Sequence, residues 1–354
     1  MGLSVNIKKK TGDFFLDVSF ETENSVLGLL GASGCGKSMT LKCIAGVEKP
    51  DEGRIVLNDR VLFDSEKGIN LPPQKRKVGY LFQDYALFPN MTVLQNVKCG
   101  SKDLGKAKEY IKKYALEGTE DLYPDQLSGG QKQRVALARM LSSNPETILL
   151  DEPFTALDNF LKARLERQIM EVIEDVKAPI IFVSHDRNEV YRLTDTIAVM
   201  ENGHIVDISE KHELFKSPKT LASTLLTGCK NVTRLKRQEN GNYFATDWGI
   251  KLCDAPFKDK EYRFAGFRAH DLKMVTNGNE FGKENILHSE IVREVEDTFS
   301  VVIQFFPKGL EEKTEYSLLT YETDPSMWND IKENMDGRTI TMQIPDEAII
   351  WMSE

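Results

Sequence analysis

The sequence has no long apolar run. Its longest apolar stretches are short, such as PIIFV at 179–183, and none approaches the roughly 20 residues that a membrane-spanning helix needs. The first ten residues, MGLSVNIKKK, have no apolar core after their charges, which argues against a secretory signal. We therefore expect neither a membrane span nor a cleaved leader in this chain.

The chain also lacks a net positive charge and has few cysteines. The 354 residues include 46 Lys and Arg against 55 Asp and Glu, a net charge of −9, whereas nucleic-acid binders usually show a basic footprint. The five cysteines are scattered and form no C-x-x-C pair: Cys35, Cys43, Cys99, Cys229 and Cys253. These features argue against a nucleic-acid partner and a zinc site, and they favour unpaired thiols in a reducing cytosol.

The chain divides into two regions of different pattern. In the first, the apolar runs in TILLDEP (147–153) and PIIFVSHD (179–186) flank a charged helical stretch, a βαβ pattern that predicts a parallel sheet. From Asn231 onward, short alternating strands with Gly and Asp turns predict a β-rich domain, one barrel or two degenerate repeats. The expected parts are an α/β domain at 1–228, a helical subdomain within it at about 84–142, and a β-rich domain at 229–354.

Residues 31–38, GASGCGKS, fit the phosphate-loop pattern G-x-x-x-x-G-K-[ST]. The glycines let backbone N–H groups wrap phosphates, and the following helix presents its partly positive N-terminus. Lys37 is a point charge for the β- and γ-phosphates, and Ser38 offers a hydroxyl ligand to Mg²⁺. The residues expected to bind ATP are Gly31, Ala32, Ser33, Gly34, Cys35, Gly36, Lys37, Ser38 and Met39.

Other polar residues follow predicted strands. The apolar run before Asp151 and Glu152 delivers both to the carboxyl end of a strand, where ligands of α/β sheets bind. We expect Asp151 to hold Mg²⁺ through water and Glu152 to act as the general base that orients the attacking water. His185 near the end of FVSHD and Gln83 at the end of VGYLFQ share this strand-end placement. His185 is placed to reach a γ-phosphate, and Gln83 to sense Mg²⁺ and the attacking water, although an isolated His is more often structural.

These motifs, in this order, resemble the nucleotide-binding subunit of ABC transporters over about residues 1–228. The match consists of the phosphate loop, Gln83, LSGGQKQR (127–134), LLDEP (149–153), ALD (156–158) and His185. The resemblance implies an α/β P-loop NTPase cassette, with a RecA-like core and a helical subdomain, that hydrolyses ATP with Mg²⁺. It also implies a head-to-tail homodimer that sandwiches two ATP molecules.

The motif LSGGQKQR has two interpretations. Ser128 and Gln131 fit the capping box S-x-x-Q at a helix start, which would justify one glycine at most. In the dimer that the resemblance implies, Ser128, Gly129, Gly130 and Gln131 contact the ATP of the other subunit. Asp158 would then belong to a loop that crosses the dimer interface.

The family usually stacks an N-terminal aromatic residue on adenine. Phe14 and Phe15 are the nearby candidates. Their spacing to the phosphate loop is short, and either ring could instead belong to the core.

A finer resemblance covers residues 53–93, which look like bacterial and archaeal importer ATPases, especially those for molybdate. Sulfate, thiosulfate, tungstate and ferric-iron importers are the alternatives. This resemblance implies a peripheral subunit at the cytoplasmic face of the cell membrane, with two separate transmembrane permease subunits and an external binding protein. Leu87 and Phe88 would lie where the permease docks, or they could be ordinary core residues of the helical subdomain.

The C-terminal region resembles the regulatory OB/TOBE-like barrel of importer ATPases, through FRAHDL (267–272) and EDTFSVVIQF (296–305). Such a barrel can bind an oxyanion or carry no ligand at all. An anion site needs hydroxyls, backbone N–H groups or an Arg. The candidates are Thr298, Ser300, Lys283 and Arg268.

Three other functions are less favoured. A soluble ABC ATPase of DNA repair or translation is disfavoured by the single phosphate loop, the acidic charge and the lack of a long heptad run. A mainly sensory protein is disfavoured by the intact Glu152 and His185, which favour working catalysis. An exporter is disfavoured by the lack of a fused membrane domain.

Overall fold

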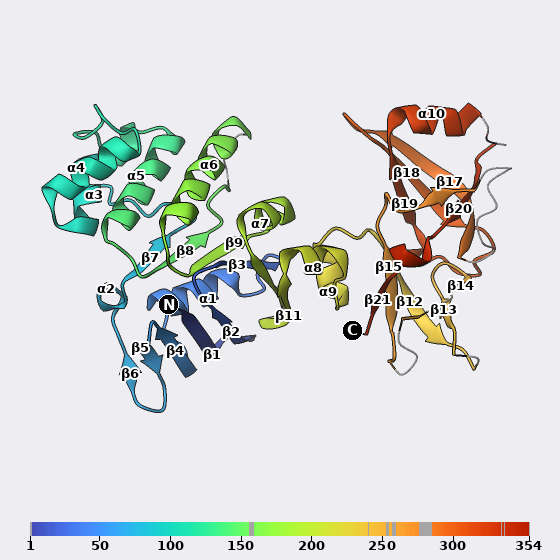
Figure 1. Ribbon diagram of the computed structural model, residues 1–354, viewed down its shortest axis with the longest axis horizontal. Helices are drawn as coiled ribbons and strands as arrows, with labels where there is room; N and C mark the ends of the chain where they lie inside the picture. Colours follow the sequence, from blue (N-terminus) through green and yellow to red (C-terminus); the bar gives the residue numbers. More distant parts are fainter. Residues whose placement is uncertain are drawn as a thin grey trace. The chain divides into compact units, whose positions relative to one another are not determined.

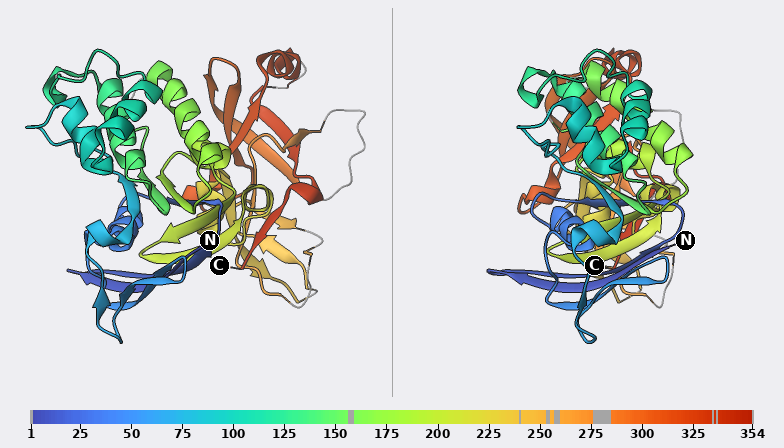
Figure 2. Two further views of the ribbon diagram at one scale, coloured as in Figure 1. Left: turned by 60° about the vertical axis from the view of Figure 1, so that its left-hand side comes forward. Right: turned by 90° about the vertical axis from the view of Figure 1, so that its left-hand side faces the viewer.

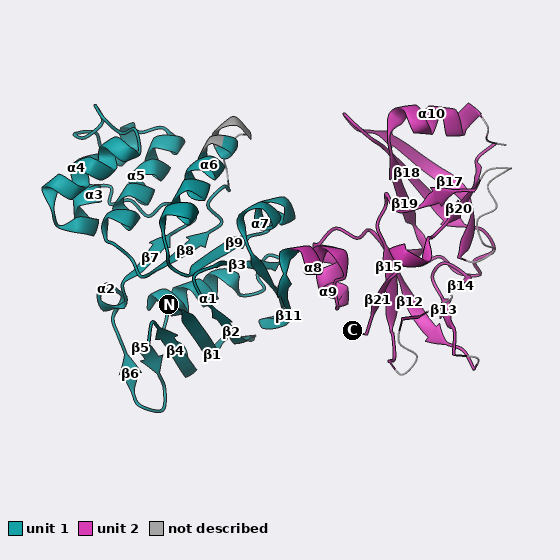
Figure 3. Cartoon of the chain, viewed as in Figure 1, with its two compact units in different colours: residues 1–211 teal, residues 212–354 magenta. Residues whose placement is uncertain are grey.

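The computed structural model describes residues 2–155, 159–239, 241–252, 255–256, 260–275, 285–333, 335 and 337–353. The chain forms two compact units, residues 1–211 and 212–354 (Figure 3). Residues 212–228, which the sequence pattern places in the first domain, group with the second unit. A compact unit and a family domain are different divisions, so the expected boundary after residue 228 stays a prediction.

An eleven-stranded sheet organises the first unit, in the order β6-β5-β4-β1-β2-β11-β10-β3-β9-β8-β7. Its strands are β1 (Leu3–Thr11), β2 (Phe14–Thr22), β3 (Val26–Gly31), β4 (Glu52–Leu57), β5 (Arg60–Asp64), β6 (Ile69–Asn70), β7 (Val78–Leu81), β8 (Thr147–Asp151), β9 (Ile180–Ser184), β10 (Thr196–Glu201) and β11 (His204–Glu210).

One half of this sheet is parallel and the other half is antiparallel. Strands β10, β3, β9, β8 and β7 pair in parallel, and every residue of β3, β8 and β9 is buried, as both faces of a parallel sheet require. Strands β1, β2, β4, β5 and β6 pair antiparallel. The crossover from β8 through α6 (Asn159–Asp175) to β9 is the predicted βαβ unit. The carboxyl ends of β3, β7, β8 and β9 therefore meet at one edge.

The helices of this unit form two groups. Helix α1 (Lys37–Ala45) follows β3 and lies against the sheet, and α7 (Arg187–Leu193) follows β9 (Figure 1). Helices α3 (Val93–Ser101), α4 (Leu104–Lys113) and α5 (Gly129–Ser142) lie side by side in all the views, within the stretch that the sequence pattern marks as helical (Figures 1 and 2). A short helix, α2 (Pro73–Arg76), and a 3₁₀ turn, η1 (Pro124–Gln126), complete the unit.

A buried arginine holds the far end of α1. The side chain of Arg76 has no exposed surface, and its Nη1 donates to the carbonyls of Cys43 and Ile44 at 2.8 Å each. These carbonyls belong to the last turn of α1, which lacks intrahelical partners and carries partial negative charge. Burial lowers the pKa of Arg76, and the carbonyls compensate for its lost hydration.

In its described residues, the second unit contains two five-stranded sheets, with helices before the sheets and between two of their strands. Helices α8 (Lys211–Lys216), which begins at the unit boundary, and α9 (Leu221–Leu226) precede the sheets, and α10 (Pro325–Glu333) lies between β19 and β20 in the chain. The first five-stranded sheet has β14 (Ile250–Leu252), β13 (Tyr243–Ala245), β12 (Asn231–Arg237), β15 (Phe264–Phe267) and β21 (Ile350–Met352). The second has β16 (Lys273–Met274), β20 (Thr339–Gln343), β17 (Ile286–Glu296), β18 (Val301–Pro307) and β19 (Leu319–Thr323). Turn η2 (Glu315–Ser317) lies between β18 and β19 of the second sheet, and turn η3 (Asp346–Ala348) lies between β20 of the second sheet and β21 of the first.

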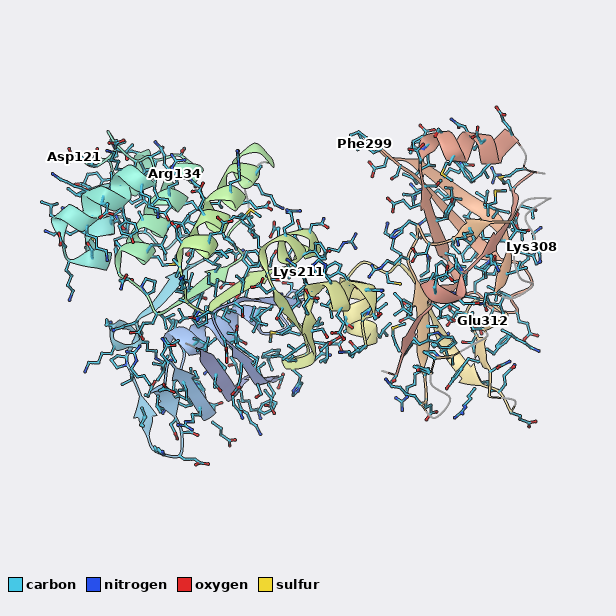
Figure 4. All side chains as sticks on the ribbon, in the orientation of Figure 1. Asp121, Arg134, Lys211, Phe299, Lys308 and Glu312 are labelled. Carbon is cyan, nitrogen blue, oxygen red and sulfur yellow. The ribbon has the colours of Figure 1, made fainter. Side chains whose placement is uncertain are left out.

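All strand pairs described in this unit are antiparallel, which confirms the predicted β-rich character. One cluster of buried residues draws on both sheets, including Trp248 and Phe267 from the first part and Phe305 from the second. The β17–β18 hairpin projects beyond this core, and Phe299 at its tip is 87% exposed (Figure 4). The two sheets of this OB/TOBE-like region thus share one core.

Candidate functional site

The phosphate loop runs from the end of β3 to the start of α1. Gly34 and Gly36 have φ angles of 82° and 109°, in the left-handed region that glycine adopts without steric cost. A Cβ at Gly36 would lie 2.7 Å from Cδ1 of Leu16, and a Cβ at Gly31 would lie 2.5 Å from the carbonyl oxygen of Met200. Glycine is therefore required at these positions by the fold itself, before any ligand is considered.

The ammonium of Lys37 lies inside this loop. Its Nζ donates to the carbonyl oxygens of Gly31 at 2.7 Å and Ala32 at 2.9 Å, and the residue is 5% exposed. The charge is thus held at the start of α1, where the helix N-terminus adds its own positive potential. Both features favour an anion above the loop.

Asp151 accepts hydrogen bonds on both of its oxygens. Ser38 Oγ donates to Oδ1 at 2.8 Å, and Tyr80 Oη donates to Oδ2 at 2.9 Å. Burial raises the pKa of Asp151, and the hydrogen bonds from Ser38 and Tyr80 oppose that rise. Hydroxyl and carboxylate oxygens are the ligands that Mg²⁺ prefers, so the donor set formed by Ser38 and Asp151 fits this metal.

Glu152 is held between two partners. Its Oε2 lies 3.3 Å from Nδ1 of His185 and accepts a hydrogen bond from Oγ1 of Thr155 at 3.0 Å. Its backbone N–H donates to the carbonyl of Val183, and its φ angle is 46°, a conformation that costs energy in a residue other than glycine. Such strain is common at functional sites, and the Glu152 carboxylate lies beside His185.

A cavity of about 830 Å³ joins these parts. Its lining includes Lys37, Ser38, Gln83 and Glu152, together with Phe14 from β2, and its volume is typical of small-molecule sites. His185 contacts Glu152, which lines the cavity. Phe15 points elsewhere, since it is 43% exposed and its ring lies 6.3 Å from that of His204. The structure thus brings together the predicted phosphate loop, Gln83 and Glu152, and it singles out Phe14 of the two aromatic candidates.

The start of α5 has the predicted capping box. Ser128 Oγ accepts from the backbone N–H of Gln131 at 3.3 Å, and Gln131 Oε1 accepts from the N–H of Ser128 at 2.9 Å. A Cβ built on Gly129 would have no atom of the described chain within 4 Å. The fold of the described residues therefore gives no steric reason for glycine at this position, and the helix N-terminus is open to solvent.

Helix α5 is bonded to the loop after Glu152. Gln133 is 1% exposed, and its Nε2 donates to the carbonyl of Pro153 at 2.6 Å. Sequence reasoning missed this residue, as it missed Tyr80, because each bond joins distant segments. The alternation of VGYL in a strand was the available signal for Tyr80, because it places Tyr80 and Leu81 on opposite faces.

Hydrogen bonds from Arg139 and Asn96 stabilise the loop after Gln83. Tyr85 and Ala86 have φ angles of 62° and 42°, and their carbonyls accept from Arg139 at 2.9 and 2.8 Å. The Arg139 guanidinium lies 5.2 Å from the centre of the Phe88 ring, and Asn96 Oδ1 accepts from the Phe88 N–H at 3.0 Å. Phe88 is nevertheless 47% exposed. The loop is thus fixed in shape while it presents an aromatic ring to solvent.

Several remaining candidates are placed less clearly. Asp158 and Lys283 lie outside the described residues. Arg268 donates to the backbone carbonyls of Thr227 and Phe215, and Ser300 donates to Glu322 at 3.1 Å. These polar groups are engaged within the protein, so an oxyanion site built from them stays a prediction.

Two further expectations concern helices and thiols. Within the described residues, no helix combines the length and apolarity that a bilayer crossing demands. The described cysteines, Cys35, Cys43, Cys99 and Cys229, are free thiols, and Cys253 lies outside the described residues.

Comparisons with known proteins identify relatives of this chain. The ABC transporter family model matches residues 16–155. The chain is 39% identical over 222 residues to a molybdenum import ATP-binding protein of Paramagnetospirillum magneticum, which covers 61% of each chain. It is 42% identical over 222 residues to an Fe(3+) ions import ATP-binding protein of Haemophilus influenzae, which covers 60% of this chain and 62% of that protein. The matched stretch spans about three fifths of the length of these two relatives.

A third relative and a solved structure extend the match. The chain is 42% identical over 236 residues to a probable sulfate/thiosulfate import ATP-binding protein of Chlorella vulgaris, which covers 64% of this chain and 98% of that protein. The structure of the ATP-binding cassette MJ0796 bound to ADP and Pi superposes with a TM-score of 0.51 and 28% identity, over 60% of this chain and 99% of the cassette. On this similarity and the shared cassette fold, the chain belongs to the ABC transporter family.

Proposed function

We propose that the chain hydrolyses ATP as the nucleotide-binding subunit of an importer. The observation that carries this proposal is the cavity in which Lys37, Ser38, Gln83 and Glu152 converge. Lys37 and the N-terminus of α1 would bind the phosphates. Ser38 and Gln83 would hold Mg²⁺ with Asp151, and the metal would neutralise charge on the phosphates as the terminal bond breaks.

Glu152 is the general base in this proposal. With Oε2 held by His185 and Thr155, the other oxygen, Oε1, can accept a proton from a water aimed at the γ-phosphate. His185 would orient the base and contact the γ-phosphate. Gln83 would align the same water and report the state of the site to the loop that follows it.

A second copy of the chain would complete the site. Ser128, Gly129, Gly130 and Gln131 at the open start of α5 would contact the γ-phosphate bound by the other subunit, and the helix N-terminus would add positive potential there. Asp158 would cross the interface. The cassette MJ0796 is dimeric in its structure with ADP and Pi, which supports this arrangement.

We propose an oxyanion as the imported substrate, with molybdate first and tungstate, sulfate or thiosulfate next. The relatives named for molybdenum and sulfate import support this order. Iron import is the alternative, supported by the Haemophilus relative, and polyamine import is another, since a spermidine/putrescine import protein of Clostridioides difficile is 37% identical over 271 residues.

The membrane partners follow from this role. Two transmembrane permease subunits would bind the loop after Gln83, where Phe88 is exposed, and an external binding protein would deliver the substrate to them. The chain would then work as a peripheral subunit at the cytoplasmic face of the cell membrane. The second unit would serve as a regulatory domain, with an oxyanion as its possible ligand.

A substitution of the base tests ATP hydrolysis. Glu152→Gln keeps the shape of the side chain but cannot accept the proton, so we expect turnover to be abolished while ATP binding and an ATP-trapped dimer persist. Glu174→Gln, an exposed carboxylate on α6, is the matched control and should behave as the wild type. Undiminished steady-state hydrolysis by Glu152→Gln would remove Glu152 from the role of base.

The substrate needs a separate test. ATPase activity is measured for the chain purified with its permeases in vesicles, with binding protein and molybdate, sulfate, ferric iron or spermidine outside. We expect stimulation by molybdate, and stimulation by iron or spermidine alone would overturn the oxyanion assignment.

Calorimetry of the full chain with molybdate, tungstate and sulfate tests for an anion site on the second unit. The unit has no such site if none of the three anions releases or absorbs heat on mixing.

A further inference from the structure

Helices α6 and α7 both belong to the first unit and are labelled in Figure 1. Charged side chains of α6 form ion pairs with side chains of α7 and with Asp186, which follows His185. Helix α6 starts directly after residue 158, and α7 starts at Arg187, two residues after His185. The contacts between them form two groups, one around Lys162 and one between Glu166 and Arg192. Because 162 and 166 are one helical turn apart, both groups lie on the same face of α6.

The first group surrounds Lys162. Its Nζ lies 3.0 Å from Oδ2 of Asp186 and 2.5 Å from Oε1 of Glu189. Glu189 is 5% exposed, and its other oxygen, Oε2, accepts from Oγ of Ser184 at 2.5 Å. A carboxylate this deeply buried is stable only when it is paired, and Lys162 is the cation in contact with it.

The bonds reach the backbone on both sides of His185. Ser184 precedes His185, and its hydroxyl also accepts from the N–H of Asp186 at 2.9 Å. Asp186 follows His185 and caps α7, since its Oδ1 accepts from the N–H of Asn188 at 2.8 Å. The ammonium of Lys162 thus contacts Asp186 directly and is linked to Ser184 through Glu189, so it is connected to both neighbours of His185.

The second group fixes the direction of α7. Arg192 Nε and Nη2 lie 2.5 and 3.0 Å from the two oxygens of Glu166, a bidentate pair whose geometry is specific. Its charges run opposite to those of the first group, since α6 supplies the cation at 162 and the anion at 166. Two contact points of opposite polarity set both the distance and the rotation of α7 against α6.

We propose that Lys162 is a positioning residue that fixes the backbone on both sides of His185 against helix α6. The network keeps Nδ1 of His185 3.3 Å from the Glu152 carboxylate. A displacement of the start of α6 is transmitted to His185 through this network. The inference rests on the proposed function, because the position of His185 matters only if ATP is hydrolysed beside Glu152.

The contribution of this ion-pair network to the stability of the fold is small. Buried ion pairs contribute little net stability, whereas the loss of one partner is costly because the other charge stays buried. A variant that removes Lys162 alone would therefore confound loss of fold with loss of position. Removing Lys162 and the Glu189 charge together separates the two effects.

The experiment uses the full-length chain with Lys162→Met, Lys162→Arg and the double variant Lys162→Met/Glu189→Gln. Lys113→Met is the matched control, because Lys113 also pairs with α6, through Asp175 at 2.8 Å, in an exposed ion pair. Three properties are measured: the imidazole NMR signal of His185 in the nucleotide-free protein, the unfolding temperature, and kcat and KM for ATP. The chain has five histidines, and the signal that is lost in His185→Ala identifies His185.

We expect Lys162→Met to shift or broaden the His185 signal and to lower kcat on the order of tenfold or more, with KM nearly unchanged, because a small misplacement near the reacting atoms is costly. Lys162→Arg should restore the signal and much of kcat. The double variant should recover the unfolding temperature without recovering kcat, and Lys113→Met should match the wild type.

Two results would overturn the proposal: an unshifted His185 signal in Lys162→Met, or recovery of kcat together with the unfolding temperature in the double variant. The NMR readout needs no ATP, so it also separates the two proposals. If Lys162→Met moves the His185 signal while His185→Ala hydrolyses ATP at the wild-type rate, the positioning role holds and the catalytic role of His185 fails.

Discussion

Ser38 and Asp151 are 113 positions apart in the chain, yet the hydroxyl of Ser38 donates a hydrogen bond of 2.8 Å to the Asp151 carboxylate. The bond joins the first turn of α1 to the end of β8, so it ties the phosphate loop to the carboxylate edge of the parallel sheet. Both groups are oxygen ligands of the kind that Mg²⁺ prefers. The hydrogen bond therefore holds the start of α1 and the end of β8 together, with both oxygen groups side by side.

Ser38→Ala removes one of these oxygens. We expect the affinity for the metal to fall on the order of tenfold or more, while ATP binding without metal changes little because Lys37 and the backbone N–H groups remain. Mn²⁺ binding in the presence of ATP, followed by electron paramagnetic resonance, measures the affinity. Ser101→Ala, at the half-buried last residue of α3, is the control, and equal metal affinity in both variants would exclude Ser38 as a ligand.

Phe14 and Phe15 offer a matched pair for the adenine contact. Phe14 lines the cavity with the phosphate loop, whereas Phe15 faces His204. An aromatic stack contributes about 0.5–1.5 kcal/mol, so Phe14→Ala should raise the dissociation constant for ATP about two- to tenfold, and Phe15→Ala should leave it unchanged. Titration with a fluorescent ATP analogue checks this. Equal effects of the two substitutions would mean that neither ring stacks on the base.

Arg139 holds the loop after Gln83 in an unusual shape. Arg139→Met removes the donors to the carbonyls of Tyr85 and Ala86, and two left-handed residues then lose the contacts that stabilise them. We expect faster hydrogen exchange of the amides over residues 85–92, with the exchange of the β8 and β9 amides unchanged. Exposed Arg167→Met on α6 is the control. Unaltered exchange over 85–92 would mean that Asn96 alone maintains the loop.

Asp247 should make the second unit sensitive to acid. Burial would raise the pKa of Asp247, but hydrogen bonds from Arg234 and Thr314 outweigh it and lower the pKa from 3.8 to about 2. A lowered pKa in the folded state adds stability above pH 3.8, which is lost as the pH falls toward 2. Asp247→Asn should therefore be less stable by about 1–3 kcal/mol at pH 7 and show a flatter dependence between pH 4 and pH 2.

Tryptophan fluorescence can follow this change in the intact protein. The three tryptophans of the chain, Trp248, Trp328 and Trp351, all lie in the second unit, so their emission reports the unfolding of that unit. Glu296→Gln, an exposed carboxylate on β17, serves as the control. If Asp247→Asn keeps the acid dependence of the wild type, that dependence arises elsewhere.

Local patterns accounted for most of the nucleotide site. Three features depend on residues within a few positions of one another: the phosphate loop, the strand that ends at Asp151, and the capping box of Ser128 and Gln131. Local sequence is therefore enough to predict them. The same holds for the parallel crossover from β8 to β9, because an apolar run, an amphipathic helix and another apolar run allow few other arrangements.

Residues that act across long separations were not predicted. Tyr80 meets Asp151 across 71 positions, Arg139 meets Tyr85 across 54, and Lys162 meets Asp186 across 24. None of these side chains belongs to a short motif, and each is a polar or charged residue that could equally lie on a solvated surface. Only the packing of the helices on the sheet shows which of them are buried and paired.

The sequence by itself determined the parallel crossover, the glycine loop at residues 31–38 and the β-rich character of the second unit, because each follows from local conformation and from the periodicity of apolar residues. The tertiary structure decided which groups meet: Ser38 and Tyr80 on one carboxylate, His185 and Thr155 on another, and Phe14 rather than Phe15 in the cavity. The physical reason is that a hydrogen bond or an ion pair depends on distances of about 3 Å, and such distances between remote segments exist only once the sheet has aligned its strand ends and the helices have packed against it.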